Sequence, residues 1–568
     1  MKFSALPFAL TPVLHLPIAN RSRRSKLARL ILLAIVCCQP LARAKEIGRP
    51  PELGTAARDV AADFRLPPLH DGPGSDLAAR FSELQVGKRA RELKLNARSA
   101  CEAWMAADAT LQSARMRLSA TPPAGARSFD GMRASELNIL LRDPAVQAVK
   151  VRSPHLEMDE PVLLRRAKFW LDLGTTELRA AEGGPRFLLR VENTSEVTVS
   201  GGTFMGGQWG MLVDGSQDVI IQGGRYVGLQ FGGIVFNNAP RVVLAHVFLT
   251  QIGGAPVLIH GDTSGSVVID NEIIGNRGPS NWHAGVVISD RNGMVADDPQ
   301  SILNADHYGA REQLINTRLH VPRRNILAYN HIALNASSGI YSDGGIETVI
   351  FNNTVEGNAK EGVCLDNGSS ANVMAMNVVR LNGQRWGKTD SELKLDFVDG
   401  LGRLPDGSSP AKTPGISLDN SFYNVVYANQ IERNYGGGVK MVRTAYFNII
   451  GLNTIVDNNQ GKNERFHFFG VELGAAKADV PVTDLDFTPC QGNIVFGNTI
   501  RGAHYAGIFL GPGSTENDIF DNTVFGATNW AMEQVIAQPN ASLNNLTNLP
   551  SRNISAGIDA NLLKISGQ

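Results

Sequence analysis

The chain lacks an excess of charge of either sign. Its 568 residues contain 54 Lys and Arg and 54 Asp and Glu, so the formal net charge at pH 7 is zero. A protein without a net field does not attract nucleic acid or an anionic membrane through its overall charge, and a polyanion has to be met by a local patch. We therefore expect no nucleic-acid partner.

The chain is also poor in cysteine, with five in 568 residues. Cys37 and Cys38 lie in an N-terminal apolar segment, and neither C-x-x-C pairs nor Cys/His clusters predict a zinc site from the others. For Cys101, Cys364 and Cys490, one disulfide with one remaining thiol and three buried thiols are both open. P-loop, nucleophile-elbow and zinc-peptidase motifs are missing, which argues against nucleotide hydrolysis, serine esterase and zinc peptidase activity.

The N-terminal segment has no apolar run long enough for a membrane span. A basic run at 21–26 precedes an apolar stretch that begins at Leu27, and Ala42-Arg43-Ala44 follows. The stretch is shorter than the roughly 20 residues that a bilayer requires. We predict a signal peptide over residues 1–44, cleaved after Ala44, and a periplasmic or secreted protein. An uncleaved membrane anchor is the alternative.

A repeat of 23 or 24 residues is the strongest feature that the sequence does contain. The pattern Asn-x-[Ile/Val/Leu] recurs at this interval where nothing interrupts it, and in six of eight units a second Asn follows five residues later. The first asparagines of these units are Asn271, Asn330, Asn353, Asn377, Asn429, Asn453, Asn498 and Asn522.

A further strand pattern, Gly-[Ile/Val]-x-[apolar]-x, occurs later in each unit, as at 339–343 and 362–366. Each unit then holds three short strands separated by Gly, Asn and Asp corners. One unit of this size cannot bury a core, whereas stacked units can. We predict an all-β protein, a right-handed parallel β-helix (solenoid) with an N-terminal helical segment, whose coils occupy residues 146–535.

The segments on either side of the coils differ in composition. Phe81 to Leu118 is rich in Ala, Arg, Glu and Leu at helical spacing, so we expect an N-terminal helical or capping region over 45–145, packed on or near the first coil. A C-terminal cap or tail over 536–568 would cover the open edge of the last coil.

Strand alternation makes the outward-facing residues of the Gly-led strand readable. The second and fourth side chains point into the core, and the third and fifth point outward. The fifth-position residues are Asp214, Asn237, His260, Ser289, Asp343, Asp366, Asp419, Val442 and Gly474. The third-position residues are Leu212, Val235, Leu258, Val287, Tyr341, Cys364, Ser417, Lys440, Glu472 and Phe509. Coils stack at about 4.8 Å, so such rows match a linear polymer. Solvation of an exposed sheet face is the alternative.

Three insertions interrupt the period, at about 294–323, 383–413 and 474–491, each just before or after this strand. Long loops in compact folds are usually functional. We expect them to wall the outward rows into a groove.

His260 and Arg291 are the strongest candidates for catalysis. Ile-His-Gly-Asp at 259–262 is followed one coil later by Ser-Asp-Arg at 289–291. The C5 proton of a uronic acid can be removed only when its carboxylate is neutralised and a base is within reach. His260 suits the base, and Arg291 can pair with the carboxylate. The structural alternatives are a hydrogen-bonded surface histidine and a salt bridge at a corner.

Other residues complete the predicted site. Asp262 joins the catalytic set, and Tyr341 or His283 can return a proton. The predicted substrate-binding residues are Asp290, Asp343, Asp366, Asp419, Lys440 and Glu472. The aspartates at 343, 366 and 419 leave two further interpretations open, a pair of carboxylates for glycoside hydrolysis or oxygen ligands for Ca²⁺. Proton abstraction itself requires no cofactor.

The coil pattern resembles the pectate-lyase-like β-helix families, and the coil order resembles periplasmic polymannuronate C5-epimerases. Those enzymes carry Asp-Pro-His-Asp on this strand and a carboxylate-binding arginine in the following coil. Only His260, Asp262 and Arg291 transfer, because Leu258-Ile259 replaces the leading Asp-Pro and Gly261 intervenes.

Together with the N-terminal signal, the resemblance predicts an exported protein that acts on an acidic polysaccharide by C5-proton abstraction, followed by epimerisation or β-elimination. We expect it to be a monomer. Components of a polysaccharide export apparatus are a further class of partner. A glycoside hydrolase with paired Asp is one alternative, although the Gly-His-Gly and Arg-x-Lys signatures of β-helix pectin hydrolases are missing. A non-catalytic polysaccharide-binding, export or adhesin protein is the other.

Overall fold

The structure is a computed structural model that describes residues 98–180, 183–277, 283–289, 321–383, 413–442, 445–460, 469–474, 490–502, 506–511, 514–525, 535–537, 544–546 and 563–564. The predicted signal peptide, most of the predicted tail and most of each insertion lie outside these residues. Asp290 and Arg291 lie outside them as well.

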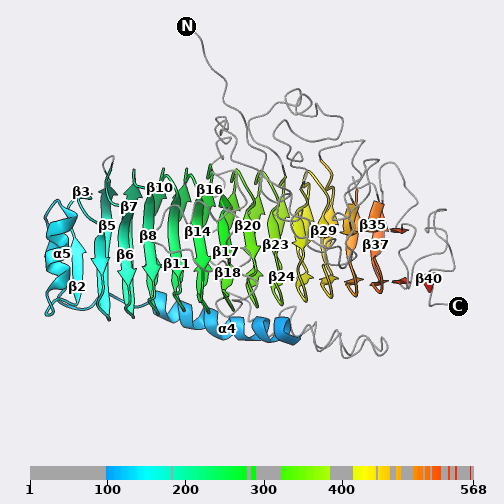
Figure 1. Cartoon of the computed structure of the whole chain (residues 1–568), viewed down its shortest axis with the longest axis horizontal. Coiled ribbons are helices and arrows are strands. Elements are labelled where there is room, and N and C mark those ends of the chain that lie inside the picture. The colour runs from blue at the N-terminus through cyan, green and yellow to red at the C-terminus, as the bar shows by residue number, and fades with distance from the viewer. Residues whose placement is uncertain are drawn as a thin grey trace, which may run out of the picture.

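The described residues form the predicted right-handed parallel β-helix (Figure 1). Each coil contributes one strand to a 13-stranded sheet and two strands, in two columns, to a 27-stranded sheet. The 13-stranded sheet runs β4 (Val162–Leu164), β6 (Phe187–Glu192), β8 (Trp209–Asp214), β11 (Gly232–Asn237), β14 (Ala255–His260), β17 (Val286–Ser289), β20 (Ile340–Asp343), β23 (Val363–Asp366), β26 (Ile416–Asp419), β29 (Val439–Val442), β32 (Phe469–Leu473), β35 (Ala506–Leu510) and β38 (Val535–Ala537).

The 27-stranded sheet begins with five strands that precede the regular repeat, namely β1 (Arg127–Phe129), β2 (Ala148–Val151), β3 (His155–Glu157), β5 (Phe169–Arg179) and β7 (Val197–Met205). Its first column continues as β9 (Ile220–Gln222), β12 (Val243–Ala245), β15 (Val267–Ile269), β18 (Ile326–Ala328), β21 (Val349–Phe351), β24 (Val373–Ala375), β27 (Val425–Tyr427), β30 (Ile449–Gly451), β33 (Ile494–Phe496), β36 (Asp518–Phe520), β39 (Asn544–Leu546) and β40 (Leu563–Lys564). Its second column continues as β10 (Arg225–Val227), β13 (Phe248–Thr250), β16 (Glu272–Ile274), β19 (His331–Ala333), β22 (Thr354–Glu356), β25 (Val378–Arg380), β28 (Gln430–Glu432), β31 (Thr454–Val456), β34 (Thr499–Arg501) and β37 (Thr523–Phe525).

The recurring glycine marks a place where neighbouring coils approach each other closely. A Cβ on Gly339 would lie 2.3 Å from Val355 Cγ1 and 2.7 Å from the carbonyl oxygen of Gly362. Neither atom can withdraw far, because one belongs to the packed core and the other to the neighbouring backbone. The inward side chains that follow each glycine, such as Ile340 and Val363, then form one continuous core.

The repeated asparagines form buried ladders along the corners, one rung for each coil. The side chain of Asn377 accepts from the Asn353 backbone N–H at 2.9 Å and donates to Asn429 Oδ1 at 3.0 Å and to the Ile350 carbonyl at 2.8 Å. The same three kinds of hydrogen bond tie Asn358 to its neighbours in the second predicted ladder. A third ladder, not predicted from the sequence, consists of Asn372, Asn424, Asn448, Asn493 and Asn517.

Two described helices accompany the coils. Helix α4 (Arg98–Leu118) lies along the first column, where it contacts β9, β15, β21 and β24, and not at the first coil as we had expected (Figure 1). Its Trp104 ring stands edge-on to Phe351 at 5.1 Å between centroids. Helix α5 (Ala134–Arg142) packs beside β4 at the N-terminal end and directs Leu137 and Leu141 into the core. In the described part of the chain, no helix combines the length and the apolar character that a membrane span needs.

An asparagine ladder should be sensitive to the loss of a single rung. Asn377→Ala leaves buried backbone and amide partners without a hydrogen bond, and we expect it to lower the free energy of unfolding by about 3 kcal/mol. Gln430→Ala, which removes an exposed amide from the neighbouring strand, should change it by less than about 0.5 kcal/mol. Urea denaturation followed by circular dichroism measures both, and equal midpoints would contradict the structural role of the ladder.

A charged trio on the second column makes stability depend on pH. Glu356 binds His331 Nε2 at 2.8 Å and Arg380 Nε at 2.6 Å, and these partners, His331 first, lower the pKa of the Glu356 carboxyl from 4.5 to about 2. A carboxyl whose pKa is lowered by folding stabilises the protein above the unfolded pKa, and this contribution disappears as pH falls through the folded value.

The variant Glu356→Gln should therefore be less stable than the parent chain at pH 6, by up to about 3 kcal/mol. The difference should shrink between pH 4.5 and about 2, as the parent carboxyl becomes protonated. Urea midpoints of the two proteins at a series of pH values provide the measurement. A difference that stays constant over this interval would show that the trio does not contribute through ionisation.

Candidate functional site

The outward rows of the 13-stranded sheet have the register that the sequence predicts. Asp214, Asn237, His260, Ser289, Asp343 and Asp366 lie opposite one another on successive strands, and we call them the fifth-position row. Leu212, Val235, Leu258, Val287, Tyr341, Cys364, Ser417, Lys440, Glu472 and Phe509 form the third-position row. Adjacent rungs of either row are about 4.8 Å apart.

The outer face that carries these rows is largely buried. His260 is 4% exposed, Asn237 7% and Asp343 2%. Beside them, the third-position side chains from Leu212 to Cys364 pack with Phe187 into an apolar cluster separate from the coil interior. The alternative that these side chains merely solvate an exposed sheet face is therefore wrong for His260, Asn237 and Asp343, because they are not exposed. Buried polar groups of this kind require hydrogen-bond partners.

A chain of hydrogen bonds connects His260 to the two preceding coils. The Asn237 amide donates through Nδ2 to Asp214 Oδ1 at 2.8 Å. The Oδ1 atom of the same amide lies 2.8 Å from His260 Nδ1. Asn237 and Asp214 appear in the predicted row, but no role was predicted for either. Their positions immediately before His260 in that row could have indicated that they contact it.

On the C-terminal side of His260, tyrosine and carboxylate side chains are joined. The Tyr341 hydroxyl donates to Asp366 Oδ2 at 3.0 Å, and the Asn367 side chain donates to Asp343 Oδ1. Tyr341 is 3% exposed and lies two coils from His260, while Ser289 occupies the coil between them. The structure thus brings Tyr341, Asp343 and Asp366 together, two to three coils from the predicted base.

The remaining predicted residues lie at the edges of this cluster or outside it. Asp262 is exposed at the corner after β14, where its backbone N–H donates to Asn238 Oδ1 at 2.9 Å. Lys440 Nζ lies 3.8 Å from Glu472 Oε1, so these two predicted substrate ligands form an ion pair. Asp419 lies opposite Val442, next along the chain from Leu418.

His283 is less suited to return a proton than its sequence position indicated. Burial, followed by the nearby charge of Lys360, lowers the pKa of His283 to about 4. Its imidazole is therefore neutral at pH 7 and offers no imidazolium proton. Its Nδ1 is buried and lacks a hydrogen-bond partner among the described residues.

A cluster of opposite charges on β6 was missed from the sequence. Glu192 is buried and binds Arg165 Nη2 at 2.7 Å and also Arg190, and it lies opposite Asp214. Because Leu188 occupies the place where later strands have glycine, the repeat pattern did not include this strand. It extends the fifth-position row by one charged rung.

The described residues bear on two further predictions, the metal site and the state of the cysteines. No group of three or more His, Cys, Asp or Glu side chains within the described ranges is arranged to hold a metal ion. Cys364 and Cys490 are both buried free thiols, and burial raises the pKa of Cys490 to about 12. The side chain of Cys101 is outside the description.

The insertions attach at both ends of the strands that carry the rows. One follows Ser289 at the end of β17 and another follows Gly474 after β32, whereas the third precedes β26. Their attachment points therefore flank the rows, as predicted. Their own course lies outside the described residues.

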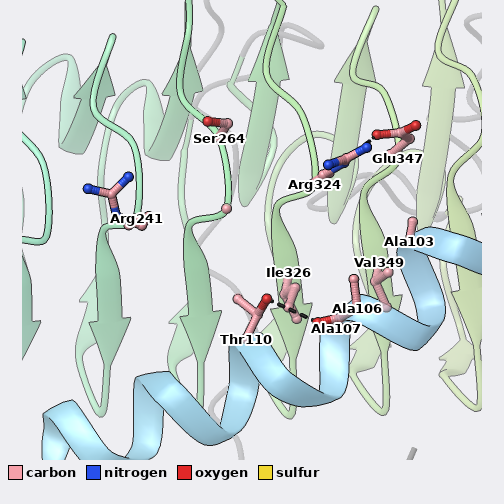
Figure 2. Close-up of a pocket in the computed structure, with 11 residues that line it drawn as sticks. Ala103, Ala106, Ala107, Thr110, Arg241, Ser264, Arg324, Ile326, Glu347 and Val349 are labelled. Carbon is pink, nitrogen blue, oxygen red and sulfur yellow. Dashed lines mark hydrogen bonds and ion pairs between the residues drawn. The ribbon is translucent and has the colours of Figure 1, made fainter. Parts of the chain in front are cut away.

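A second candidate location is a cavity of about 340 Å³ between α4 and the first column. Figure 2 shows small side chains such as Ala107 and Thr110 on its helix side, and Arg241 and Arg324 on different coils. Arg324 pairs with Glu347 at 2.7 Å, and Arg241 pairs with Asp218 at 2.6 Å. Because both cations are already neutralised, the cavity has no evident means of holding an anion, and we place the candidate site on the 13-stranded sheet.

Comparison with known proteins adds little about the reaction. No curated protein matches the sequence. Among solved structures, a mutant of the periplasmic alginate epimerase AlgG is 15% identical with a TM-score of 0.39, over 66% of this chain and 79% of that one. The A-module of the Azotobacter vinelandii mannuronan C-5 epimerase AlgE4 is 14% identical with a TM-score of 0.43, over 70% and 90%.

PfbA, a surface adhesin of Streptococcus pneumoniae, is 10% identical with a TM-score of 0.40, over 73% of this chain and 88% of that one. Likenesses of this size do not tell an enzyme from an adhesin, so function has to be argued from this chain's own residues. Residues 188–382 match the family model described as "Right handed beta helix region".

Proposed function

We propose that the protein is an exported enzyme that removes the C5 proton of a uronate residue in an acidic polysaccharide, with His260 as the base. The observation that carries this proposal is the buried His260, hydrogen-bonded through Nδ1 in the middle of a straight row of polar side chains. Such a row has the repeat and direction of a linear polymer, because its rungs recur at about 4.8 Å.

Abstraction requires that the negative charge developing beside the substrate carboxylate be stabilised. We assign that task to Arg291, which follows Ser289 by two residues at the end of β17. His260 then takes the C5 proton. If Tyr341 returns a proton to the opposite face, the sugar is epimerised; if the C4–O bond breaks instead, the chain is cleaved by β-elimination.

Tyr341 is well placed for the second half of either reaction. Its oxygen is held by Asp366 at 3.0 Å, two coils beyond His260. The two side chains belong to rows about 7 Å apart across the strands, given a rise of about 3.3 Å for each residue. A sugar ring lying over Ser289 would therefore have the histidine on one side and the phenol on the other.

Glycoside hydrolysis is a second candidate, and one observation favours it. Asp343 and Asp366 face each other on adjacent strands, and a spacing of about 5 Å between two carboxyl groups is typical of retaining glycosidases. Both carboxylates already accept hydrogen bonds, from Asn367 and Tyr341. The first proposal uses the Asp366 contact to position Tyr341, whereas hydrolysis would require both carboxylates to exchange these partners for substrate.

Replacement of His260 tests the first proposal. The full chain would be incubated with polymannuronate, polyguluronate, polygalacturonate and polyglucuronate, with proton NMR to detect epimerisation and near-ultraviolet absorbance to detect elimination. We expect His260→Gln to lower the rate on the active polymer by roughly 10²- to 10⁴-fold, since general base catalysis contributes that much. Glu272→Gln, an exposed change on the same coil, should leave the rate unchanged. A His260→Gln protein with parental activity would refute the base, and would favour a binding role.

Hydrolysis predicts a different pattern in the same assay. Under the first proposal, reducing ends appear only together with near-ultraviolet absorbance, or do not appear at all, and His260→Gln abolishes turnover. New reducing ends without absorbance would support the carboxylate pair instead, provided that Asp343→Asn and Asp366→Asn each remove them while His260→Gln does not.

A further inference from the structure

We infer that Asp214, acting through Asn237, fixes the tautomer of His260, so that Nδ1 carries the proton and Nε2 carries the lone pair. The catalytic meaning of this arrangement rests on the proposed function, but its geometry does not. Asp214 and Asn237 are thus positioning residues in the two coils before the base.

The direction of each hydrogen bond follows from what each group can do. An ionised carboxylate only accepts, so Asp214 takes a hydrogen from the Asn237 Nδ2 atom at 2.8 Å. That choice turns the Oδ1 atom of the amide toward His260, at 2.8 Å from Nδ1. An amide oxygen also only accepts, so Nδ1 must be the donor. In a neutral imidazole, the lone pair then resides on Nε2.

The strand register explains why Asp214 acts on His260 through an intermediate residue. Asp214 and His260 are separated by the whole of β11, which is about 10 Å at two rungs. The carboxylate therefore cannot reach the imidazole directly. Asn237 lies on the rung between them. Its amide, oriented by Asp214, presents its oxygen to the imidazole without placing a full negative charge against the ring.

Burial restricts Asn237 and His260 to one hydrogen-bonding arrangement. Asn237 is 7% exposed and His260 4% exposed, so water has little access to turn the amide or to offer Nδ1 another partner. The apolar side chains of Val235 and Leu258, 1% and 4% exposed, stand beside them on the same two strands. In such surroundings an unmatched pair of acceptors is costly, which holds the three groups to one pattern.

Nitrogen NMR of the full chain tests the inference without any substrate. With ¹⁵N-labelled histidine at pH 8.5, where an ordinary imidazole with a pKa of about 6.5 is neutral, the resonances lost in His260→Gln identify those of His260. We expect the one-bond N–H coupling on Nδ1 and a lone-pair shift on Nε2. In Asp214→Asn the amide of residue 237 is free to turn, so the Nδ1–H form should fall to roughly half of the population or less.

Two comparisons make the outcome decisive. Glu272→Gln, on the same coil as His260 but on the other sheet, should keep the parental tautomer, and circular dichroism confirms that each variant is folded. A parental Nε2–H tautomer, or an Nδ1–H tautomer that survives Asp214→Asn unchanged, would overturn the inference.

Turnover on the active polymer separates the inference from the proposed function. If His260 is protonated on Nδ1 and this form is lost in Asp214→Asn while no uronate polymer is converted, the positioning role of Asp214 and Asn237 stands and the proposed function fails. If His260→Gln abolishes turnover but the parental imidazole is protonated on Nε2, the proposed function stands and the positioning role of Asp214 and Asn237 is refuted. If both stand, Asp214→Asn should lower the rate roughly in proportion to the lost Nδ1–H population.

Discussion

In-register stacking of parallel coils is the constraint on which the remaining structure depends. A residue in one coil meets the residue at the same position in the coils before and after it, so each position of the repeat becomes a straight row. Inward rows have to be apolar to close the core. The corner rows have to satisfy their own backbone, which the asparagines do by bonding both to one another and to the chain. Only the outward rows can vary without unfolding the solenoid, and chemistry can therefore be placed there.

The division between inward and outward rows also explains how the outer face of the 13-stranded sheet can change from apolar to polar along the solenoid. Along the third-position row, side chains change from Leu212, Val235 and Leu258 to Tyr341, and then to the Lys440–Glu472 ion pair. The inward positions beneath change little, since from β8 to β35 they are Val, Ile, Leu and Met except for Phe236 and Ser342. The fold is consequently compatible with many surfaces, and the presence of a solenoid does not by itself decide between an enzyme and an adhesin.

Much of this arrangement could be predicted from the sequence, because period and alternation fix register. The rows through His260 and Tyr341 and two of the three asparagine ladders were predicted correctly. The contacts of α4 could not be, since an amphipathic helix reveals which of its faces is buried but not which coils it lies against. The third ladder lies five residues before the first and was missed although the same insertions interrupt both; in it, Thr348 takes the place of an asparagine and shortens the run. Hydrogen-bond partners such as Asp214 and Asn237 depend on side-chain directions, which a repeat pattern does not encode.

The site combines two rows that would be ordinary if they were apart. Without the apolar third-position row, the fifth-position row would be open to water, and water would replace the weak preference of an amide for one orientation. Without the polar row, Val235 and Leu258 would merely be a second small core. Side by side, the apolar row excludes solvent and the polar row supplies direction, so the His260 imidazole is held by the hydrogen bond between its Nδ1 and Asn237. Because each row is built from successive coils, the hydrogen-bonded residues Asn237 and Asp214 that lead to His260 lie 23 and 46 positions earlier in the sequence.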